Sequence, residues 1–278
     1  YTNLSAVLDS AHYPPSFSRP YLGLRSQHAL QLIGGRDKLS LEDVIARKHS
    51  MRMLLADRVK ADLLSAVAAT NPAGDVAAAA ELLQRWDNTA AAESRGAVLF
   101  EAWWTRYMQV DPRVRGQRRE ALLFQRPWSE QDPTGTPSGL ADFTRAAAAF
   151  AQAVAETKQK YGAFDVAWGD VHRVRLGTVD EPVGGCGGNL GCFRVLWFTP
   201  SEDGKQLAFG GDGWILAVEF GKVPRAYSVL SYGESNKPDS PHYSDQAALF
   251  ARGVLKPVHF TQQDVERNTV RRYHPGLQ

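Results

Sequence analysis

A serine, a histidine and an aspartate lie within six residues of one another near the C-terminal end of the chain. They are Ser240, His242 and Asp245, in the segment SPHYSDQ. These are the side-chain types of a hydrolytic triad, but working triads are assembled from segments far apart in the sequence. We therefore interpret the segment as structural, with Ser240 as a cap and with Asp245 and Gln246 bound to backbone groups.

A second histidine, His172, lies among charged residues in the segment WGDVHRVRLG, residues 168–177. A histidine in such surroundings could serve as a general base. In an extended segment, however, His172 and Arg173 would point to opposite faces, and a structural hydrogen bond would satisfy each of them. We favour this structural interpretation.

Cys186 and Cys192 are the only cysteines, and they lie in the glycine-rich segment PVGGCGGNLGCF, residues 182–193. Two thiols without two histidines at ligand spacing are too few for a structural zinc site, so no metal site is predicted. The segment also lacks the Lys-Ser/Thr pair and the helix start of a phosphate-binding loop. A disulfide, which an oxidising compartment would allow, and a pair of free thiols both remain open.

The elements that must position these groups fall into two regions of different character. Residues 1–160 are mostly helical in pattern. Ser40 and Asp43 have capping-box spacing, apolar residues recur at helical spacing over 51–64, and 140–161 is rich in alanine. Two further helices are predicted over 76–86 and 97–108.

Residues 161–278 change to strand signals. Short aromatic and β-branched runs predict strands over 193–198, 214–220 and 226–230, and Thr261 with Asp264 predicts the start of a last short helix. Helices followed by strands favour an α+β fold over alternating βαβ units.

Composition excludes several classes of partner. The chain has 278 residues, 44% of them hydrophobic and 22% charged, which is ordinary for a globular protein. A formal net charge of +2 gives no reason to expect nucleic acid or an acidic membrane. No apolar run approaches the ~20 residues that span a bilayer. The chain opens at Tyr1 without a signal peptide, and we expect this to be a start within a longer protein.

Four segments carry a resemblance to a known family. They are residues 8–33, 86–104 (WDNTAAAESRGAVLFEAWW), 168–177 and 210–260. Together they closely resemble the C-terminal part of the β-subunit of penicillin acylases (penicillin amidases), which are N-terminal nucleophile hydrolases and include acyl-homoserine-lactone acylases. The resemblance implies that the chain is part of an αββα sandwich with a largely helical first half.

The resemblance also implies an activity. Such proteins are made as precursors that cleave themselves and expose an N-terminal serine, which attacks the amide of an N-acylated small molecule: a β-lactam, an acyl-homoserine lactone or a lipopeptide. That serine and the oxyanion asparagine would lie upstream of Tyr1, so no catalytic residue is expected in this chain, and the chain alone should be inactive. A non-catalytic structural or binding module derived from the same fold is the alternative.

The family pattern assigns further expectations. Arg25 occupies the place of an arginine close to the active site, and an exposed arginine on a helix is the open alternative. The cysteines should be oxidised, because the family is mostly exported to the periplasm or secreted. His12 stands where relatives often carry an acid near a calcium site, so no cofactor is expected here, although the parent protein could bind calcium. The expected partners are the α-subunit and the N-terminal part of the β-subunit, together with the amide substrate.

Overall fold

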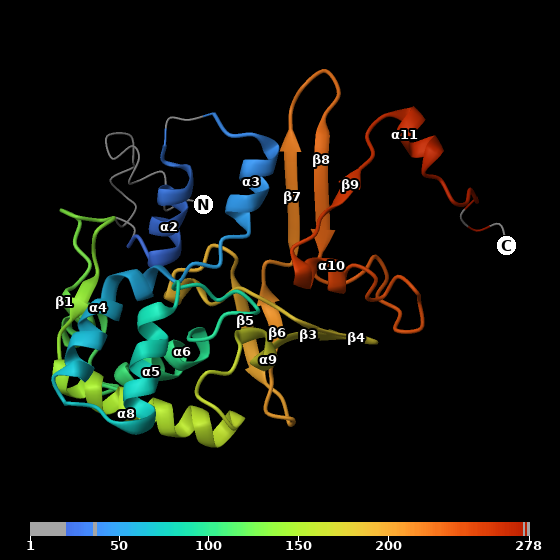
Figure 1. Ribbon diagram of the computed structural model, residues 1–278. Helices are drawn as coiled ribbons and strands as arrows, with labels where there is room; N and C mark the ends of the chain where they lie inside the picture. The colour runs from blue at the N-terminus through green and yellow to red at the C-terminus, as the bar shows by residue number, and fades with distance from the viewer. Residues whose placement is uncertain (1–20, 36–37, 275, 277–278) are drawn as a thin grey trace.

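The computed structural model describes residues 21–35, 38–274 and 276. Helices dominate the first part of the chain and strands the second (Figure 1), so the predicted α+β fold is confirmed. The large helices are α2 (Leu24–Ile33), α3 (Leu41–Lys48), α4 (Leu54–Ala68), α5 (Gly74–Arg85), α6 (Ala97–Tyr107), α7 (Gly116–Leu123) and α8 (Phe143–Tyr161). The short ones are α9 (Trp168–Val171), a 3-10 turn η1 (Gly188–Leu190), α10 (Ala247–Arg252) and α11 (Gln262–Arg267).

The strands form three sheets within the described residues. The first pairs β1 (Phe124–Arg126) with β2 (Ser138–Leu140). The second has the order β4-β3-β6-β5, from β3 (His172–Leu176), β4 (Val179–Pro182), β5 (Leu196–Pro200) and β6 (Gln206–Gly211), and β3 and β6 are parallel. The third is antiparallel and has the order β7-β8-β9, from β7 (Trp214–Glu219), β8 (Arg225–Leu230) and β9 (Lys256–Val258).

The helical core is built around the contact of α6 with α8. The buried face of α8 carries Ala146, Phe150 and Ala153 at helical spacing. Small alanines let α6 approach closely, and the indole of the fully buried Trp103 donates to the Ala146 carbonyl over 3.1 Å. Trp103 thereby satisfies its polar group without leaving the core.

Two helix starts follow the capping signals in the sequence. The Ser40 hydroxyl accepts from the Asp43 amide while the Asp43 carboxylate accepts from the Ser40 amide, which completes the predicted capping box. Thr261 caps α11 in the same way through the Asp264 amide. Both capping predictions are confirmed.

Two elements, α8 and β5, begin three residues later than predicted. Helix α8 begins at Phe143 rather than at residue 140, because the Asp142 side chain caps it and residues 138–140 pair with β1. Strand β5 begins at Leu196 rather than at residue 193, because the segment just before it packs against α2 and α3.

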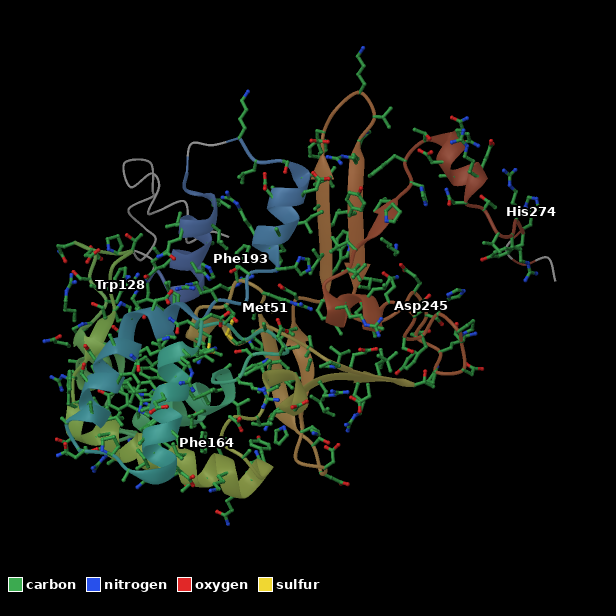
Figure 2. The ribbon with its side chains drawn as sticks, in the orientation of Figure 1. Met51, Trp128, Phe164, Phe193, Asp245 and His274 are labelled. Atoms are coloured by element: carbon green, nitrogen blue, oxygen red, sulfur yellow. A yellow bond between two sulfur atoms is a disulfide. The ribbon has the colours of Figure 1, made fainter. Side chains whose placement is uncertain are left out.

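The core clusters do not divide at residue 160. The larger cluster joins α2 and helices α4 to α8 with Trp168 and both cysteines, whereas the smaller one lies under the strands and α10. Met51 and Phe193 lie where the helical and strand-rich parts meet (Figure 2). The boundary between residues 1–160 and 161–278 stays a prediction.

Candidate functional site

Arg25 lies in the first turn of α2 and faces the junction between the two parts of the chain. Its guanidinium carbon lies 5.4 Å from the centre of the Phe193 ring, and its Nη2 lies 3.9 Å from a carboxylate oxygen of Asp212. Its side chain is 23% exposed, so it is neither a free surface arginine nor fully buried. The aromatic face and the carboxylate both favour the charged planar group in this position.

Lys48, the last residue of α3, approaches the same two groups. Its ammonium forms an ion pair with Asp212 and lies 5.2 Å from the centre of the Phe193 ring. Burial lowers the pKa of Lys48, and the Asp212 charge opposes this shift. Asp212, directly after β6, therefore links the strand part to α2 and α3 through two cations, one on each helix.

A loop closed by a disulfide packs against this cluster. Cys186 and Cys192, the candidate pair from the sequence, form a disulfide, and both side chains are fully buried. Arg25 lies over the loop, since a Cβ placed on Gly188 would be 3.3 Å from its Cδ. The loop contacts the segment before α4 as well, where the Cys192 sulfur approaches the Met51 carbonyl at 3.4 Å.

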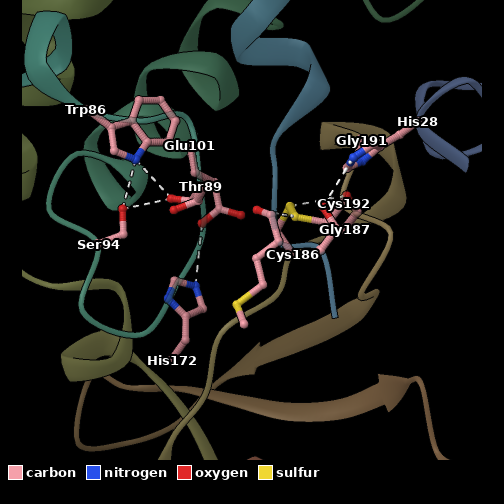
Figure 3. Close-up of a disulfide and its surroundings, with 12 residues drawn as sticks. His28, Trp86, Thr89, Ser94, Glu101, His172, Cys186, Gly187, Gly191 and Cys192 are labelled. Atoms are coloured by element: carbon pink, nitrogen blue, oxygen red, sulfur yellow. Dashed lines mark hydrogen bonds and ion pairs between the residues drawn. A yellow bond between two sulfur atoms is a disulfide. The ribbon is translucent and has the colours of Figure 1, made fainter. Parts of the chain in front are cut away.

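His28 joins α2 to the same loop (Figure 3). Its Nδ1 lies 2.7 Å from the Gly191 carbonyl, so Nδ1 carries the proton and donates it, while Nε2 lies 3.3 Å from the Ser50 hydroxyl. Burial lowers the pKa of His28, although the bond to Gly191 opposes this. Arg25 lies one helical turn before His28, so both residues lie on the same face of α2.

Sequence reasoning missed His28, Lys48 and Asp212. The three-residue spacing of Arg25 and His28 is a signal that both lie on one face of α2. No local signal pairs Lys48 with Asp212, because 164 residues separate them.

His172 has a structural role in the described geometry. It is 2% exposed, its ring stacks on the Trp168 indole at 3.5 Å, and its Nδ1 lies 3.1 Å from the Trp168 carbonyl. Its Nε2 lies 3.6 Å from a Glu101 oxygen (Figure 3). Arg173 points to the other face of β3 and binds Asp180, as the alternation predicted. Both contacts support the structural interpretation.

The Ser240 segment does not form a triad. The Ser240 hydroxyl accepts from the backbone amide of His242 over 3.2 Å, which is the predicted capping role. The Gln246 side chain accepts from the Leu230 amide, as predicted. The prediction for Asp245 was wrong: its carboxylate binds the His242 ring at 2.8 Å rather than a backbone group, because the turn brings the two side chains together at the surface.

Metal-binding clusters and membrane-spanning helices are both absent from the described residues. No group of three or more His, Cys, Asp or Glu side chains is arranged to hold a metal ion in the part of the chain that the structure describes. Among the same residues, no helix combines the length and the apolar character that crossing a bilayer requires. Tyr1 and His12, which the sequence analysis singled out, lie outside the described residues.

Comparison with known proteins gives a consistent result. The family model for penicillin amidase matches residues 3–267. Acyl-homoserine lactone acylase PvdQ of Pseudomonas fluorescens is 30% identical over 259 residues, which cover 88% of this chain and 31% of that protein. Aculeacin-A acylase of Actinoplanes utahensis is 29% identical over 226 residues, covering 77% of this chain and 27% of that protein.

Among solved structures, a thermostable penicillin G acylase from Alcaligenes faecalis matches with a TM-score of 0.49 and 17% identity, over 97% of this chain and 55% of that one. The chain thus spans about a third of the length of the curated relatives that it matches, 31% for the Pseudomonas fluorescens protein.

Proposed function

Because this chain belongs to the penicillin amidase family, we propose that it forms part of an amidohydrolase that cleaves N-acylated small molecules. The observation that carries the proposal is the match of the family model over residues 3–267, together with relatives named as acylases. Since the chain spans only 31% of one such relative, we place the rest of the catalytic machinery outside it.

The proposed reaction is acyl transfer to an N-terminal serine that lies upstream of Tyr1. The serine hydroxyl attacks the amide carbonyl, its own α-amine takes the proton and returns it to the leaving amine, and water then hydrolyses the ester. Backbone amides and an upstream asparagine would stabilise the oxyanion. This chain would contribute no nucleophile and no cofactor.

We assign Arg25 a positioning role in this reaction. Asp212 and Phe193 hold its guanidinium above the disulfide loop, which limits the conformations of a side chain that is otherwise flexible. A guanidinium fixed in this way can orient an amide or a substrate carbonyl through charge-assisted hydrogen bonds. The support is geometric, since the proposed target lies outside the described residues.

The proposed substrates are those that the relatives' names suggest, namely acyl-homoserine lactones and acylated peptides of the aculeacin type, with acylated β-lactams as a further class. The test is a panel of one compound from each class, given to the protein assembled from this chain and the remainder of its precursor. Release of the free amine and the free acid supports the proposal. Binding of these compounds without release would favour the non-catalytic module.

The proposed partner is the remainder of the same precursor, and we propose neither nucleic acid nor a membrane as a partner. Large apolar side chains exposed on the described strands and turns support this, because a partner normally covers such side chains. They include Trp197, Phe209, Trp214 and Phe220. Strands β5 and β7 are also sheet edges within the described residues, and edge strands offer unpaired backbone groups.

We further propose that the protein works in the periplasm or after secretion. The buried Cys186–Cys192 disulfide supports this, because such bonds persist in oxidising compartments. Fractionation of the native organism, followed by detection of this chain, tests the proposal. Recovery in the cytoplasmic fraction alone would contradict it.

A further inference from the structure

A cavity of about 440 Å³ lies between α3, β8 and the C-terminal end of α10, apart from the Arg25 cluster. In Figure 1, α3 stands beside the hairpin of β7 and β8, and α10 lies below them. The walls are mostly apolar, whereas the floor is basic. The residues that line this cavity include Ile45, His49, Met51, Arg194 and Leu255.

Arg194 forms the floor and is 1% exposed. Its Nη2 donates to the carbonyls of Phe250 and Ala251 at 2.5 and 3.2 Å, and its Nε is buried without a hydrogen-bond partner. No described carboxylate forms an ion pair with Arg194. Burial lowers its pKa to about 10, which the more distant Asp212 charge partly offsets. A buried charge of this kind is costly unless an anion pairs with it.

His49 presents a second nitrogen to the same space. Its Nδ1 lies 2.9 Å from the Ile45 carbonyl, and its Nε2 is buried without a partner. A Cβ placed on Gly253 would lie 3.6 Å from both His49 Nε2 and Arg194 Nη1. The glycine therefore leaves open a position that faces both nitrogens at once.

The charges at the rim already have partners. Glu42 binds Arg225 at 2.7 Å, and Arg252 binds Glu181 at 2.6 Å. At the rim, therefore, Glu42 is not available to pair with Arg194, and Arg252 is not available to bind a ligand. An anion that enters the cavity would pair with Arg194.

We propose that this cavity is a carboxylate-binding site, in which one oxygen binds Arg194 Nη1, the other binds His49 Nε2, and a short aliphatic chain lies along Ile45, Met51 and Leu255. The carboxylate has two possible sources: a free short-chain acid, or an Asp or Glu side chain of the remainder of the precursor. The site stands apart from the amidohydrolase function and does not depend on it.

Binding of a carboxylate at this site requires a proton on His49 Nε2. Burial, Arg194 and Lys48 lower the pKa of His49, whereas the bond to Ile45 and the Asp212 charge raise it. Two further charged groups, Glu42 and Arg252, lie at the rim of the cavity, and each is already paired. An anion between His49 and Arg194 would raise this pKa. Affinity should therefore increase as the pH falls from about 7.5 towards the ordinary histidine value of about 6.5.

The test uses the assembled protein and two probes of matched size, butyrate and the neutral butyramide, in calorimetric titrations. If the carboxylate is a free acid, we expect butyrate to bind and butyramide not to bind. Arg194→Met should weaken butyrate binding by about tenfold or more, because a charge-assisted hydrogen bond is lost. Arg252→Met, at the rim of the same cavity, is the matched control and should leave butyrate binding within about twofold.

A crystal structure of the assembled wild-type protein soaked with butyrate distinguishes the two sources of the carboxylate. This experiment does not depend on the folding of a variant. Butyrate on Arg194 Nη1 identifies a free acid, and an Asp or Glu side chain of the remainder at that position identifies an internal one. In the second case butyrate should not bind at this cavity. Water or an apolar side chain at Arg194 Nη1, or butyramide binding as tightly as butyrate, would overturn the proposal.

Discussion

Arg25 is held by contacts with two residues that lie far from it in the sequence, and a third contact holds its helix. Asp212 follows β6, Phe193 follows the disulfide loop, and His28 ties α2 itself to that loop. A side chain restrained from several sides gives up little conformational entropy when it binds a further group. The position of the Arg25 side chain therefore depends on these neighbours, and substituting one of them should also change it.

Arg25→Ala in the assembled protein should lower kcat by about ten- to hundredfold, with KM changed much less. A lost charge-assisted hydrogen bond costs about 1.5–3 kcal/mol, and about 1.4 kcal/mol is tenfold. Arg25→Lys should recover only part of the loss, because an ammonium lacks the planar fork. Steady-state kinetics with the best substrate of the panel measures both effects.

Arg85→Ala is the control, since Arg85 forms an exposed ion pair with Glu81 on α5. It should leave the kinetic constants unchanged. An Arg25→Ala variant with wild-type kcat/KM would remove Arg25 from the active site.

His28 should make stability depend on pH. Its folded-state pKa is lowered by burial, so below the ordinary value of about 6.5 the unfolded chain binds the proton more readily. The free energy of unfolding should therefore fall as the pH drops from about 7 to 5. In His28→Asn the amide nitrogen can still donate to the Gly191 carbonyl but does not titrate. The free energy of unfolding of this variant should therefore fall less over the same pH range than that of the wild type.

Denaturant unfolding of both proteins across this pH range measures the difference. His259→Asn, which replaces an exposed histidine, serves as the control and should follow the wild type. Identical slopes for wild type and His28→Asn would contradict the assignment of this pH dependence to His28.

The disulfide loop is the element that joins α2, α4 and the strand part. Gly191 ends the η1 turn with φ at +94°, and a Cβ there would lie 2.6 Å from Leu54 Cβ and 2.7 Å from Leu54 N. The loop thus needs glycine for its conformation and for the close approach of α4.

Gly191→Ala should destabilise the protein by about 2–5 kcal/mol, combining left-handed strain of ~1–2 kcal/mol with overpacking of ~1–3 kcal/mol. Gly204→Ala is a matched control, because Gly204 also has a positive φ, +81°, but nothing lies within 4 Å of its Cβ position. It should cost only the strain. Thermal melting of both variants compares them, and equal losses would show that the Leu54 contact is unimportant.

Several elements follow from sequence patterns alone. The alanine-rich stripe of α8, the capping pairs Ser40–Asp43 and Thr261–Asp264, and the aromatic and β-branched run of β7 are local signals, so they were predictable. The three-residue strands β1 and β2 were not, because such short runs carry no measurable period. The parallel pairing of β3 with β6 depends on the tertiary fold and has no local signal.

The candidate site shows the same limit. Arg25 and the oxidised state of the cysteine pair were both expected from the family resemblance, because the residues alone left the disulfide and the free thiols open. The carboxylate that holds Arg25 was not, because Asp212 lies in a turn-like run, GGDG, with no feature that distinguishes it from a loop residue. Contacts between segments far apart in the sequence, rather than residue types, complete this site.

At the scale of the whole molecule, the strand-rich part exposes aromatic side chains that a soluble surface does not need. Trp197 on β5 and Phe209 on β6 are 55% and 66% exposed, with ring centres 6.4 Å apart. We interpret them as part of the surface that the remainder of the precursor covers.

The chain alone should therefore self-associate at concentrations of tens of micromolar, on the order at which exposed apolar surface drives aggregation. The double substitution Trp197→Ser and Phe209→Ser should reduce association, whereas Val265→Ser, on the exposed α11, should not. Sedimentation velocity measures the distribution. A wild-type chain that stays monomeric at these concentrations would argue against a covered surface there.

The central claim is that this chain is one part of an amidohydrolase whose nucleophile lies outside it. The most direct test measures hydrolysis of a chromogenic fatty-acyl or phenylacetyl amide by the purified chain, alone and after assembly with the upstream part of its precursor. The account predicts no turnover by the chain alone and turnover after assembly, lost when the N-terminal serine of the upstream part is replaced by alanine. Turnover by the chain alone, abolished by substituting one of its own residues, would contradict it.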